Sequence, residues 1–477
     1  MLEVNGRPLN SAGILEANGV LRFSLPVRAG DRIELRAALS TVDAVSARDT
    51  LDRDLARLSL TQLVKRTRHD WNTVLSRIEF DAPPARRSLF YTCLFRALQM
   101  PARIDDSSGA YRDSRCVLRH APAGHHRYSG WSLWDNYRTQ VPLVALVAPD
   151  VGGDVADSLV DLFLSGKAQW SGPNEPFLSV RTEHAGIALL DLHRKGLGRT
   201  DPAVALSAMA AETARLPQAT PDERLELAYD QWAVAELASD MGRADTARDF
   251  RSRALAYRAL WLSIFRDLGD DADVVKARGL YQGTLWQYRW APVFDLDWLR
   301  EQALGPARFD AELSAFFDRG LFNMTNEPDI HAPFLFALTA DSSRMDAIVA
   351  RWRDRAADHW YENQRKYDRP IHQLSFSHVG FAEGMDDDGG AMSAWYVWAS
   401  LGLYPLVPGK PVYTLSFPAA SRSVIYLPNG QTFTIRRVSH GRQHPTLVRR
   451  DGRPLLTQTL RHDDLVAGGV LTFQPGR

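Results

Sequence analysis

Apolar residues recur every three or four positions over most of this chain, which is the spacing of amphipathic helices. The pattern begins near Asp49 and continues to about Leu403, with interruptions at segments that contain Pro and Gly. It is clearest in six segments: Leu89–Leu98, Val155–Leu164, Ala185–Leu192, Leu225–Ala238, Ala247–Phe265 and Met392–Leu401. So many helices, joined by loops that carry Trp, Asp and Glu, predict a mainly α fold of the (α/α) toroid type, whose loops converge at one end.

Both ends of the chain instead alternate apolar and polar residues, which is typical of β-strands. Near the start, Val20–Pro26 and Asp31–Ala38 follow this pattern, and they are too few strands for an independent sheet domain. After Pro405, four segments predict a small C-terminal β layer: Val412–Phe417, Ser423–Leu427, Thr432–Val438 and Val470–Phe473. We therefore divide the chain into residues 1–48, 49–404 and 405–477.

The composition narrows the class of function. Lys+Arg and Asp+Glu each number 57 in the 477 residues, so the formal net charge is zero. A general nucleic-acid binder needs a basic excess, and we therefore expect no nucleic-acid partner. No apolar stretch reaches the length of a membrane span, and the first residues lack the basic and apolar segments of a signal peptide.

The aromatic residues and the cysteines leave more open. The 13 Trp, 14 Tyr and 20 Phe residues suit a carbohydrate enzyme, because sugar rings stack on aromatic faces, but large helical proteins also bury many aromatic rings. Cys93 and Cys116 could form one disulfide or stay as two free thiols. The cysteines therefore do not decide the cellular compartment.

The densest group of ionisable residues is the segment Gly384-Met385-Asp386-Asp387-Asp388-Gly389-Gly390. Three adjacent carboxylates repel one another, and the glycines make the backbone costly to order. Alternate residues of an extended loop can project together, so Asp386 and Asp388 could share one catalytic site. An exposed acidic loop that caps the helix starting near Met392 would explain the same residues.

A second candidate is the segment Ser132-Leu133-Trp134-Asp135-Asn136-Tyr137-Arg138. Trp134 could stack on a sugar while Asp135 accepts hydrogen bonds from the sugar hydroxyls. An ion pair between Asp135 and Arg138, which have helical spacing, is the alternative explanation.

Two further segments combine polar and aromatic residues. Tyr281–Trp290 contains Gln282 and Trp286, and taken alone it is better explained as a loop with core aromatics. Asn326-Glu327-Pro328, followed by His331, offers oxygen ligands of the kind that calcium prefers, although a Pro turn that opens a helix explains it too. Nucleophile elbows, phosphate-binding loops and zinc spacings are absent from the sequence.

Taken in order, these segments resemble family 92 of the glycoside hydrolases. The matching motifs are Ser-Leu-Trp-Asp, Gly-x-x-Trp-Gln-Tyr, Asn-Glu-Pro, Asp-x-Asp-x-Gly-x-Met-Ser-Ala-Trp-Tyr and, after them, Leu-Tyr-Pro. The resemblance extends from about Arg32 to the end of the chain. Four motifs in one order make it far more specific than any single motif.

The resemblance implies an exo-α-mannosidase that depends on calcium and inverts the anomeric centre. It implies a fold with an N-terminal β-sandwich, a helical linker, an (α/α)6 toroid and a C-terminal β element. Residues 1–48 would then be the residual end of the sandwich, most of which we expect to be missing here. Family members are usually exported to the periplasm or secreted, but this chain starts without a signal peptide, so its compartment stays open.

The resemblance also implies a role for each residue that matches a family motif. Asp386 and Asp388 are the candidates for the general base that activates water. Trp134, Asp135, Trp286 and His331 are the candidates for sugar contacts, and Asn326 and Glu327 are the candidates for the calcium site.

One position departs from the family motif, which usually has a Glu as general acid where this chain has Gln282. An amide cannot deliver a proton to a departing oxygen, so we expect ordinary mannose–mannose links to be cleaved poorly. A phosphate ester leaves as a stable anion and needs no acid. The substitution therefore predicts mannose-1-phosphate diesters as substrates, within a mannose-containing glycan or mannosyl phosphate.

Two alternatives to this function stay open. The first is an ordinary exo-α-1,2-mannosidase in which Glu327 or Glu383 replaces the missing acid. The second is a catalytically inactive carbohydrate-binding remnant, which Gln282 and the expected loss of the sandwich both favour. The retained acidic residues argue against a remnant, because a decayed site is expected to lose charges that cost stability.

Overall fold

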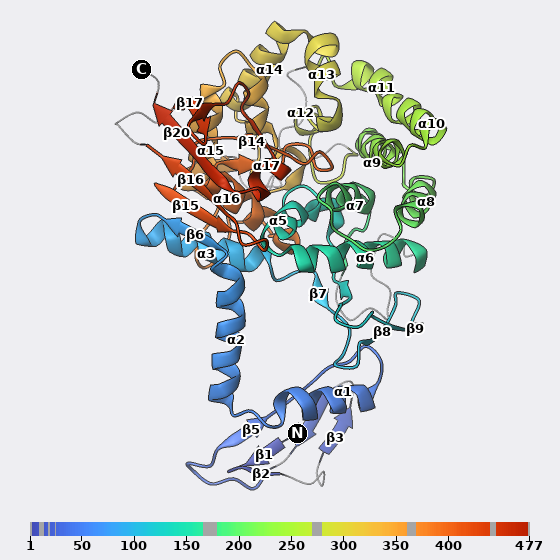
Figure 1. Ribbon diagram of the computed structural model, residues 1–477, viewed down its shortest axis with the longest axis vertical. Coiled ribbons are helices and arrows are strands. Elements are labelled where there is room, and N and C mark those ends of the chain that lie inside the picture. The colour runs from blue at the N-terminus through green and yellow to red at the C-terminus, as the bar shows by residue number, and fades with distance from the viewer. Residues whose placement is uncertain are drawn as a thin grey trace.

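The computed structural model shows a helical toroid with smaller β-sheets formed near the two ends of the chain (Figure 1). The first strands lie apart from the helical body, and the long helix α2 (Leu60–Leu75) joins them to it. The C-terminal strands pack directly on the body, where α16 (Ala391–Leu401) contacts β13 (Leu403–Tyr404). The structure describes residues 2–8, 14–17, 20–23, 25–165, 179–269, 279–359, 369–438 and 445–475.

The six helical segments predicted from the apolar spacing are confirmed. They correspond to α3 (Pro84–Ala97), α6 (Pro149–Ser165), α7 (Ala185–Arg194), α9 (Pro221–Asp240), α10 (Ala244–Leu255), α11 (Tyr257–Ile264) and α16. The segment predicted as one helix, 247–265, is two helices that meet at Ala256, whose N–H donates to the carbonyl oxygen of Arg253, three residues earlier, at 3.1 Å.

Several further helices were not predicted individually. The longer ones are α2, α5 (Gln140–Val147), α8 (Pro202–Thr213), α14 (Pro306–Asp318) and α15 (Ser343–Asp354). The shorter ones are α1 (Ala44–Thr50), α4 (Leu133–Asn136), α12 (Leu285–Tyr288), α13 (Leu296–Trp298) and α17 (His462–Val466). Every residue of α5 is buried, so this helix shows no one-sided pattern, whereas α2 is amphipathic but buries none of its residues fully.

The largest sheet joins the C-terminal strands to one strand from the helical region. Its order is β18 (Arg453–Pro454), β17 (Pro445–Arg450), β20 (Gly469–Pro475), β16 (Thr432–Arg437), β15 (Arg422–Tyr426) and β6 (Ile78–Asp81). The four predicted C-terminal strands are confirmed as β15, β16, β20 and β14 (Val412–Leu415), the last of which pairs with β13 and β19 (Thr459–Arg461). The prediction of helices between loops from Asp49 to Leu403 was wrong at β6 and at six further strands, which are too short to show a period. These strands are β7 (Ala102–Arg103), β8 (Ala110–Arg112), β9 (Leu118–His120), β10 (Tyr128–Ser129), β11 (Ala356–His359) and β12 (Ile371–Leu374).

The N-terminal strands form two small sheets of their own. One contains β1 (Leu2–Val4), β2 (Arg7–Pro8) and β5 (Ile33–Leu35), and the other is a hairpin of β3 (Ile14–Ala17) and β4 (Val20–Phe23). Cys93 is buried, Cys116 is partly exposed, and both are free thiols. Within the described ranges, the structure contains no helix that is both long and apolar enough to cross a membrane.

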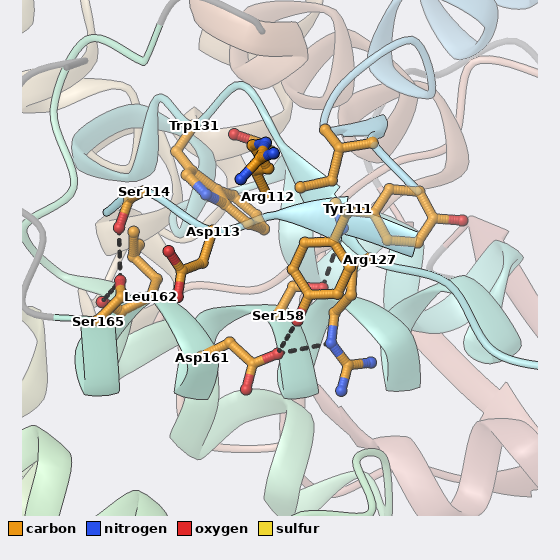
Figure 2. Close-up of a pocket in the computed structure, with 13 residues that line it drawn as sticks. Tyr111, Arg112, Asp113, Ser114, Arg127, Trp131, Ser158, Asp161, Leu162 and Ser165 are labelled. Atoms are coloured by element: carbon orange, nitrogen blue, oxygen red, sulfur yellow. Dashed lines mark hydrogen bonds and ion pairs between the residues drawn. The ribbon is translucent and has the colours of Figure 1, made fainter. Parts of the chain in front are cut away.

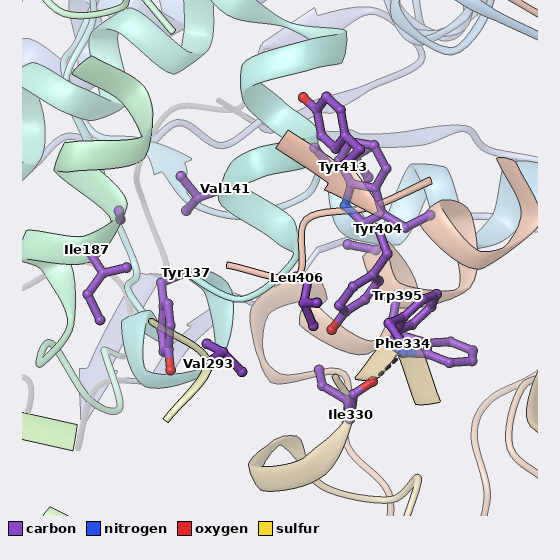
Figure 3. Packing of buried hydrophobic residues seen from close by; sticks show 14 of the residues in the cluster. Tyr137, Val141, Ile187, Val293, Ile330, Phe334, Trp395, Tyr404, Leu406 and Tyr413 are labelled. Atoms are coloured by element: carbon purple, nitrogen blue, oxygen red, sulfur yellow. Dashed lines mark hydrogen bonds between the residues drawn. The ribbon is translucent and has the colours of Figure 1, made fainter. Parts of the chain in front are cut away.

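The core of the toroid is rich in aromatic side chains that also make hydrogen bonds. Phe334 and Tyr404 stack with their ring centroids 3.7 Å apart, and the indole Nε1 of Trp395 donates to the carbonyl oxygen of Ile330 at 2.8 Å (Figure 3). Such stacked and hydrogen-bonded rings fix side-chain orientation as well as burying apolar surface. They hold α16 against the segment around Ile330, and both of these elements adjoin loops with candidate site residues.

The end of α16 generates a prediction about stability. Gly402 has a φ of 76°, and a Cβ atom there would overlap the carbonyl oxygen of Ser416. We expect Gly402→Ala to lower the free energy of unfolding by about 2–4 kcal/mol, through the left-handed backbone and the clash. Chemical denaturation measures this, with Gly380→Ala as control, since no neighbour lies within 4 Å of its Cβ position. Equal stability of the two variants would contradict the described packing.

Candidate active site

The acidic loop sends its three carboxylates in different directions. The carboxylate of Asp387 accepts hydrogen bonds from the backbone N–H and the hydroxyl of Ser393, at 2.8 and 3.0 Å, and so caps α16. Asp386 is exposed, whereas Asp388 is only partly exposed and has a φ of 44°. Both explanations of the sequence therefore hold, for different residues: the middle aspartate caps the helix, and Asp388 joins a cluster of carboxylates.

Asn136 connects this loop to the segment that contains Asp135. Its side-chain Nδ2 donates to the carbonyl oxygens of Asp388 and Gly389, both at 3.0 Å, and its Oδ1 accepts from the N–H of Ser132 at 3.2 Å. The hydroxyl of Ser132 in turn donates to the carboxylate of Asp135 at 2.5 Å. Two segments that lie far apart in the sequence are thus held together at the candidate site.

Three carboxylates from three loops meet at this place. Oxygen atoms of Asp135, Glu327 and Asp388 all lie within 4.8 Å of one another. Asp135 is 4% exposed and Glu327 is fully buried. The carboxylate oxygens of Glu327 receive no hydrogen bond from a donor group of the chain, and the carboxyl group faces that of Asp388 closely enough to share a proton with it. Buried acidic oxygens that lack a donor fit a bound cation.

The cluster carries an excess of negative charge. Burial, and then the charge of Asp388, raise the pKa of Asp135 and Glu327 well above the ordinary values, and burial likewise raises the pKa of Asp388. The guanidinium of Arg138 opposes the shift at Asp135 and Glu327, and that of Arg181 opposes it at Asp135. The Nε of Arg138 donates to the carbonyl oxygen of Trp134 at 3.2 Å, and Arg181 pairs with Glu183. These two arginines do not balance three carboxylates, so the donor set fits a divalent cation.

Gln282 lies on a neighbouring loop, with its side chain exposed and a φ of 46°. Its carbonyl oxygen accepts a hydrogen bond from Nδ2 of Asn326 at 2.6 Å, and Oδ1 of Asn326 accepts from the N–H of Glu327 at 3.1 Å. Asn326 therefore ties the Gln282 loop to the carboxylate cluster. Of the two predicted calcium-side residues, Glu327 is in the cluster, while the carboxamide of Asn326 makes these backbone contacts.

Trp134 is 1% exposed and supports the site from within the protein. Its Nε1 donates to the carboxylate of Glu226 at 2.6 Å, and the guanidinium of Arg181 lies over the ring at 5.0 Å. The predicted stacking on a sugar stays a prediction, because the ring offers almost no surface in this structure.

Trp286 and His331, the other predicted sugar contacts, are also buried. The guanidinium of Arg319 lies 4.7 Å from the ring centroid of Trp286. Nε2 of His331 lies 2.8 Å from the carbonyl oxygen of Trp290, and burial lowers its pKa to about 3. These positions favour support of the surrounding loops over direct contact with a ligand.

A buried network of charged residues around Trp134 was not predicted from the sequence. Arg181 pairs with Glu183 and lies 3.6 Å from Glu226, while His184 lies 2.6 Å from Asp230 and 3.7 Å from Glu226. The two acidic partners raise the pKa of His184 to about 9 against the effect of burial. The run Arg181-Thr182-Glu183-His184 before α7 was the available signal, but its partners come from α9.

A second polar cavity lies between the loop around β8 (Ala110–Arg112) and helix α6 (Figure 2). Its side chains pair with one another: Arg127 with Asp161 at 2.6 Å, Tyr111 with Asp161 at 3.1 Å, and Ser114 with Ser165 at 2.5 Å. The cavity volume of about 40 Å³ has room for water but not for a sugar ring. This cavity is therefore a poor candidate for a sugar site.

Comparison with known proteins gives the family of this chain. Residues 46–477 match the model of the glycosyl hydrolase family 92 catalytic domain. The chain belongs to glycosyl hydrolase family 92. The match spans all three loops of the carboxylate cluster.

Several relatives resemble this family 92 chain over different lengths. An uncharacterised secreted glycosidase of Arthroderma benhamiae is 26% identical over 202 residues, which are 41% of this chain and 24% of that protein. The family 92 glycosyl hydrolase ccman5 has a solved structure that is 25% identical, covers 92% of this chain and 66% of its own, and has a TM-score of 0.81.

Two solved structures from Bacteroides thetaiotaomicron share the fold. A family 92 α-mannosidase is 22% identical, with 92% of this chain and 62% of its own covered and a TM-score of 0.78. A family 92 inverting mannosidase is 20% identical. The match covers 95% of this chain and 67% of that chain, with a TM-score of 0.77. This chain thus spans about a quarter of the curated relative and about two thirds of the solved ones.

The raised pKa of Glu327 generates a prediction about this family 92 chain. Because its pKa in the folded state lies above the ordinary value of 4.5, the folded state loses stability as the pH rises from that value through the raised pKa. In a chelator at pH 7, Glu327→Gln should therefore raise the free energy of unfolding, by on the order of 1–3 kcal/mol. At pH 4 the two proteins should differ little. Denaturant titrations at both pH values measure this, and lower stability of the variant at pH 7 would contradict the charge excess.

Proposed function

We propose that this chain hydrolyses terminal α-mannosides, with mannose-1-phosphate diesters as the preferred substrates. The observation that carries the proposal is the convergence of Asp135, Glu327 and Asp388 beside a loop with Gln282 at the position of the family acid. Membership of family 92 supports a glycosidase, and solved relatives described as mannosidases, one in complex with mannoimidazole, support mannose as the sugar.

Water attack requires a base near the anomeric carbon. We assign this role to the pair Asp386 and Asp388. Asp386 is exposed and lies outside the carboxylate cluster, so it can accept the proton of the water while Asp388 holds a cation. In-line attack from the side opposite the leaving group inverts the anomeric centre.

The carboxylate cluster is the proposed calcium site. Asp135, Glu327 and Asp388 would hold the ion through carboxylate oxygens, which are the ligands that this hard cation prefers. When bound, calcium would offset most of the negative charge of the cluster and bind sugar hydroxyls. The burial of Glu327 and the absence of a donor group at its oxygens support a cation at this place.

The side chain at position 282 determines which kinds of leaving group can depart. Its amide can donate a hydrogen bond to a phosphate oxygen but cannot protonate an alkoxide, so it is suited to a group that departs as an anion. The exposed position of Gln282 leaves its side chain accessible to a substrate. A Glu at this position would carry a negative charge and repel the phosphate.

A specific observation favours one alternative, an ordinary exo-α-1,2-mannosidase. Burial raises the pKa of Glu327 well above its ordinary value, so in the absence of a cation this residue could hold a proton and act as the acid. Glu383, the other candidate acid, is exposed. A cation on Glu327 would keep it ionised, so the calcium proposal and this alternative exclude each other.

The proposal predicts that Gln282 divides substrates by their leaving groups. Wild-type protein should cleave a mannosyl phosphodiester and an aryl α-mannoside, while α-1,2-mannobiose should be nearly inert, because proton transfer is commonly worth about 100- to 10,000-fold. Gln282→Glu should reverse this order, so that mannobiose cleavage appears and the phosphodiester rate falls. Release of mannose from each substrate measures the rates.

The control is Gln431→Glu, the same chemical change at an exposed turn of the C-terminal sheet. It should leave the substrate order unchanged. Wild-type cleavage of mannobiose at the rate of the phosphodiester would overturn the substrate assignment and favour Glu327 as acid. Binding of mannose without cleavage of any substrate would favour the inactive remnant.

A further inference from the structure

The loop that carries Gln282 is held by an unusually complete set of contacts. Gln282 is not glycine, yet its φ of 46° lies in the left-handed region, which such residues adopt only where their surroundings determine it. We infer that Asn326 and Asp222 are positioning residues that fix this turn, and that Asn326 couples it to the carboxylate cluster. The catalytic part of this inference rests on the proposed function.

Three side chains bind consecutive backbone groups of the turn. The N–H of Tyr281 donates to Oδ2 of Asp222 at 2.7 Å, and the carbonyl oxygen of Tyr281 accepts from the hydroxyl of Tyr288 at 2.6 Å. The carbonyl oxygen of Gln282 accepts from Nδ2 of Asn326 at 2.6 Å. Hydrogen bonds on both sides of Gln282 leave its backbone little freedom to rotate.

Packing around the next residue restricts the turn further. A Cβ atom on Gly283 would lie 2.6 Å from the ring of Tyr288 and 3.0 Å from Cγ of Pro328. The guanidinium of Arg181 lies 4.1 Å from the ring centroid of Tyr281 on the other side of the turn. The turn is therefore enclosed as well as hydrogen-bonded, and the exposed side chain of Gln282 extends from a rigid base.

The two proposed positioning residues connect the turn to different parts of the site. Asn326 immediately precedes Glu327 and accepts its N–H through Oδ1, so one carboxamide bridges the turn and the cluster. Asp222 lies in the first turn of α9, the helix that also carries Glu226, the partner of the Trp134 indole. A shift of Glu327 or of α9 would therefore move Gln282 with it.

Hydrogen exchange tests the coupling without reference to activity. The amide proton of Tyr281 has Asp222 as its direct partner, so Asn326→Ala leaves that bond in place. If the turn moves as one unit, Asn326→Ala should still accelerate exchange at Tyr281 by about three- to tenfold, the effect of one lost hydrogen bond. Unchanged exchange would overturn the coupling.

Asn429→Ala is the matched control for this measurement. Asn429 bridges two backbone groups in the same way, with Nδ2 on the carbonyl oxygen of Val466 and Oδ1 on the N–H of Gln431, but it lies in the C-terminal sheet. It should leave exchange at Tyr281 unchanged. An equal acceleration by both variants would show general loosening of the fold and would also overturn the inference.

A double-mutant cycle tests whether the two residues act through Gln282. Asn326→Ala and Asp222→Ala should each lower kcat for the mannosyl phosphodiester about ten- to hundredfold, since small displacements of a reacting group have effects of this size. In a Gln282→Ala background, each should have less than about a twofold further effect. If Asn326→Ala or Asp222→Ala lowers kcat by the same factor in the Gln282→Ala background as in wild-type protein, the residue acts independently of Gln282 and the inference is overturned.

Asp222→Asn provides the conservative variant. Its side-chain oxygen still accepts the N–H of Tyr281, so it should keep near-wild-type exchange and kcat, unlike Asp222→Ala. If Asn326→Ala does not fold, the two Asp222 variants are compared instead. Equal exchange rates at Tyr281 and equal kcat values in Asp222→Asn and Asp222→Ala would overturn the inference. If wild-type protein cleaves no mannoside, the proposed function fails, while hydrogen exchange still decides the coupling.

Discussion

Mutual repulsion among Asp135, Glu327 and Asp388 is the constraint on which the rest of this structure depends. Their oxygens lie within 4.8 Å of one another in a mostly buried place, and the pKa of each carboxyl group is raised by burial. Left alone, like charges at this distance would separate or take up protons. The arrangement persists because each carboxylate sits on a loop that is fixed by other contacts.

Asparagine side chains provide much of this fixation. Asn136 binds the carbonyl oxygens of Asp388 and Gly389, and Asn326 bridges Gln282 and Glu327. An uncharged amide can donate and accept near a negative cluster without adding to its charge, which suits it to this place. Beneath these loops, the Trp395 indole binds Ile330 and the Trp134 indole binds Glu226, so the aromatic core determines where the loops lie.

The sequence predicts those parts of the molecule that leave a local pattern. Helices such as α9 and α16 have capping residues or apolar runs at recognisable spacing, and β16, after Pro405, alternates in the ordinary way. The acidic segment and the Asn-Glu-Pro segment could be selected because dense carboxylates and oxygen ligands are chemically unusual. Their order along the chain indicated the family before any geometry was known.

Contacts between segments far apart in the chain could not be predicted from the sequence. Nothing local shows that Asp387 turns to Ser393 while Asp388 turns to Asp135, or that β6 pairs with β15 across more than three hundred positions. The same limit applies to Trp134, because a tryptophan beside an aspartate could equally face a sugar or a buried Glu226. Residue type identifies the chemistry, whereas tertiary contacts decide which member of a motif performs it.

The central claim is that a divalent cation balances the carboxylate cluster, and isothermal titration of calcium into the protein tests it most directly. Titrations near pH 6 in two buffers with different ionisation enthalpies give both the affinity and the number of protons released. The account predicts one calcium ion per chain, with net proton release, because the ion displaces protons from carboxyl groups of raised pKa. It also predicts that Asp388→Asn weakens binding and reduces proton release. Failure to bind calcium, or equal binding and proton release in the variant, would contradict the account.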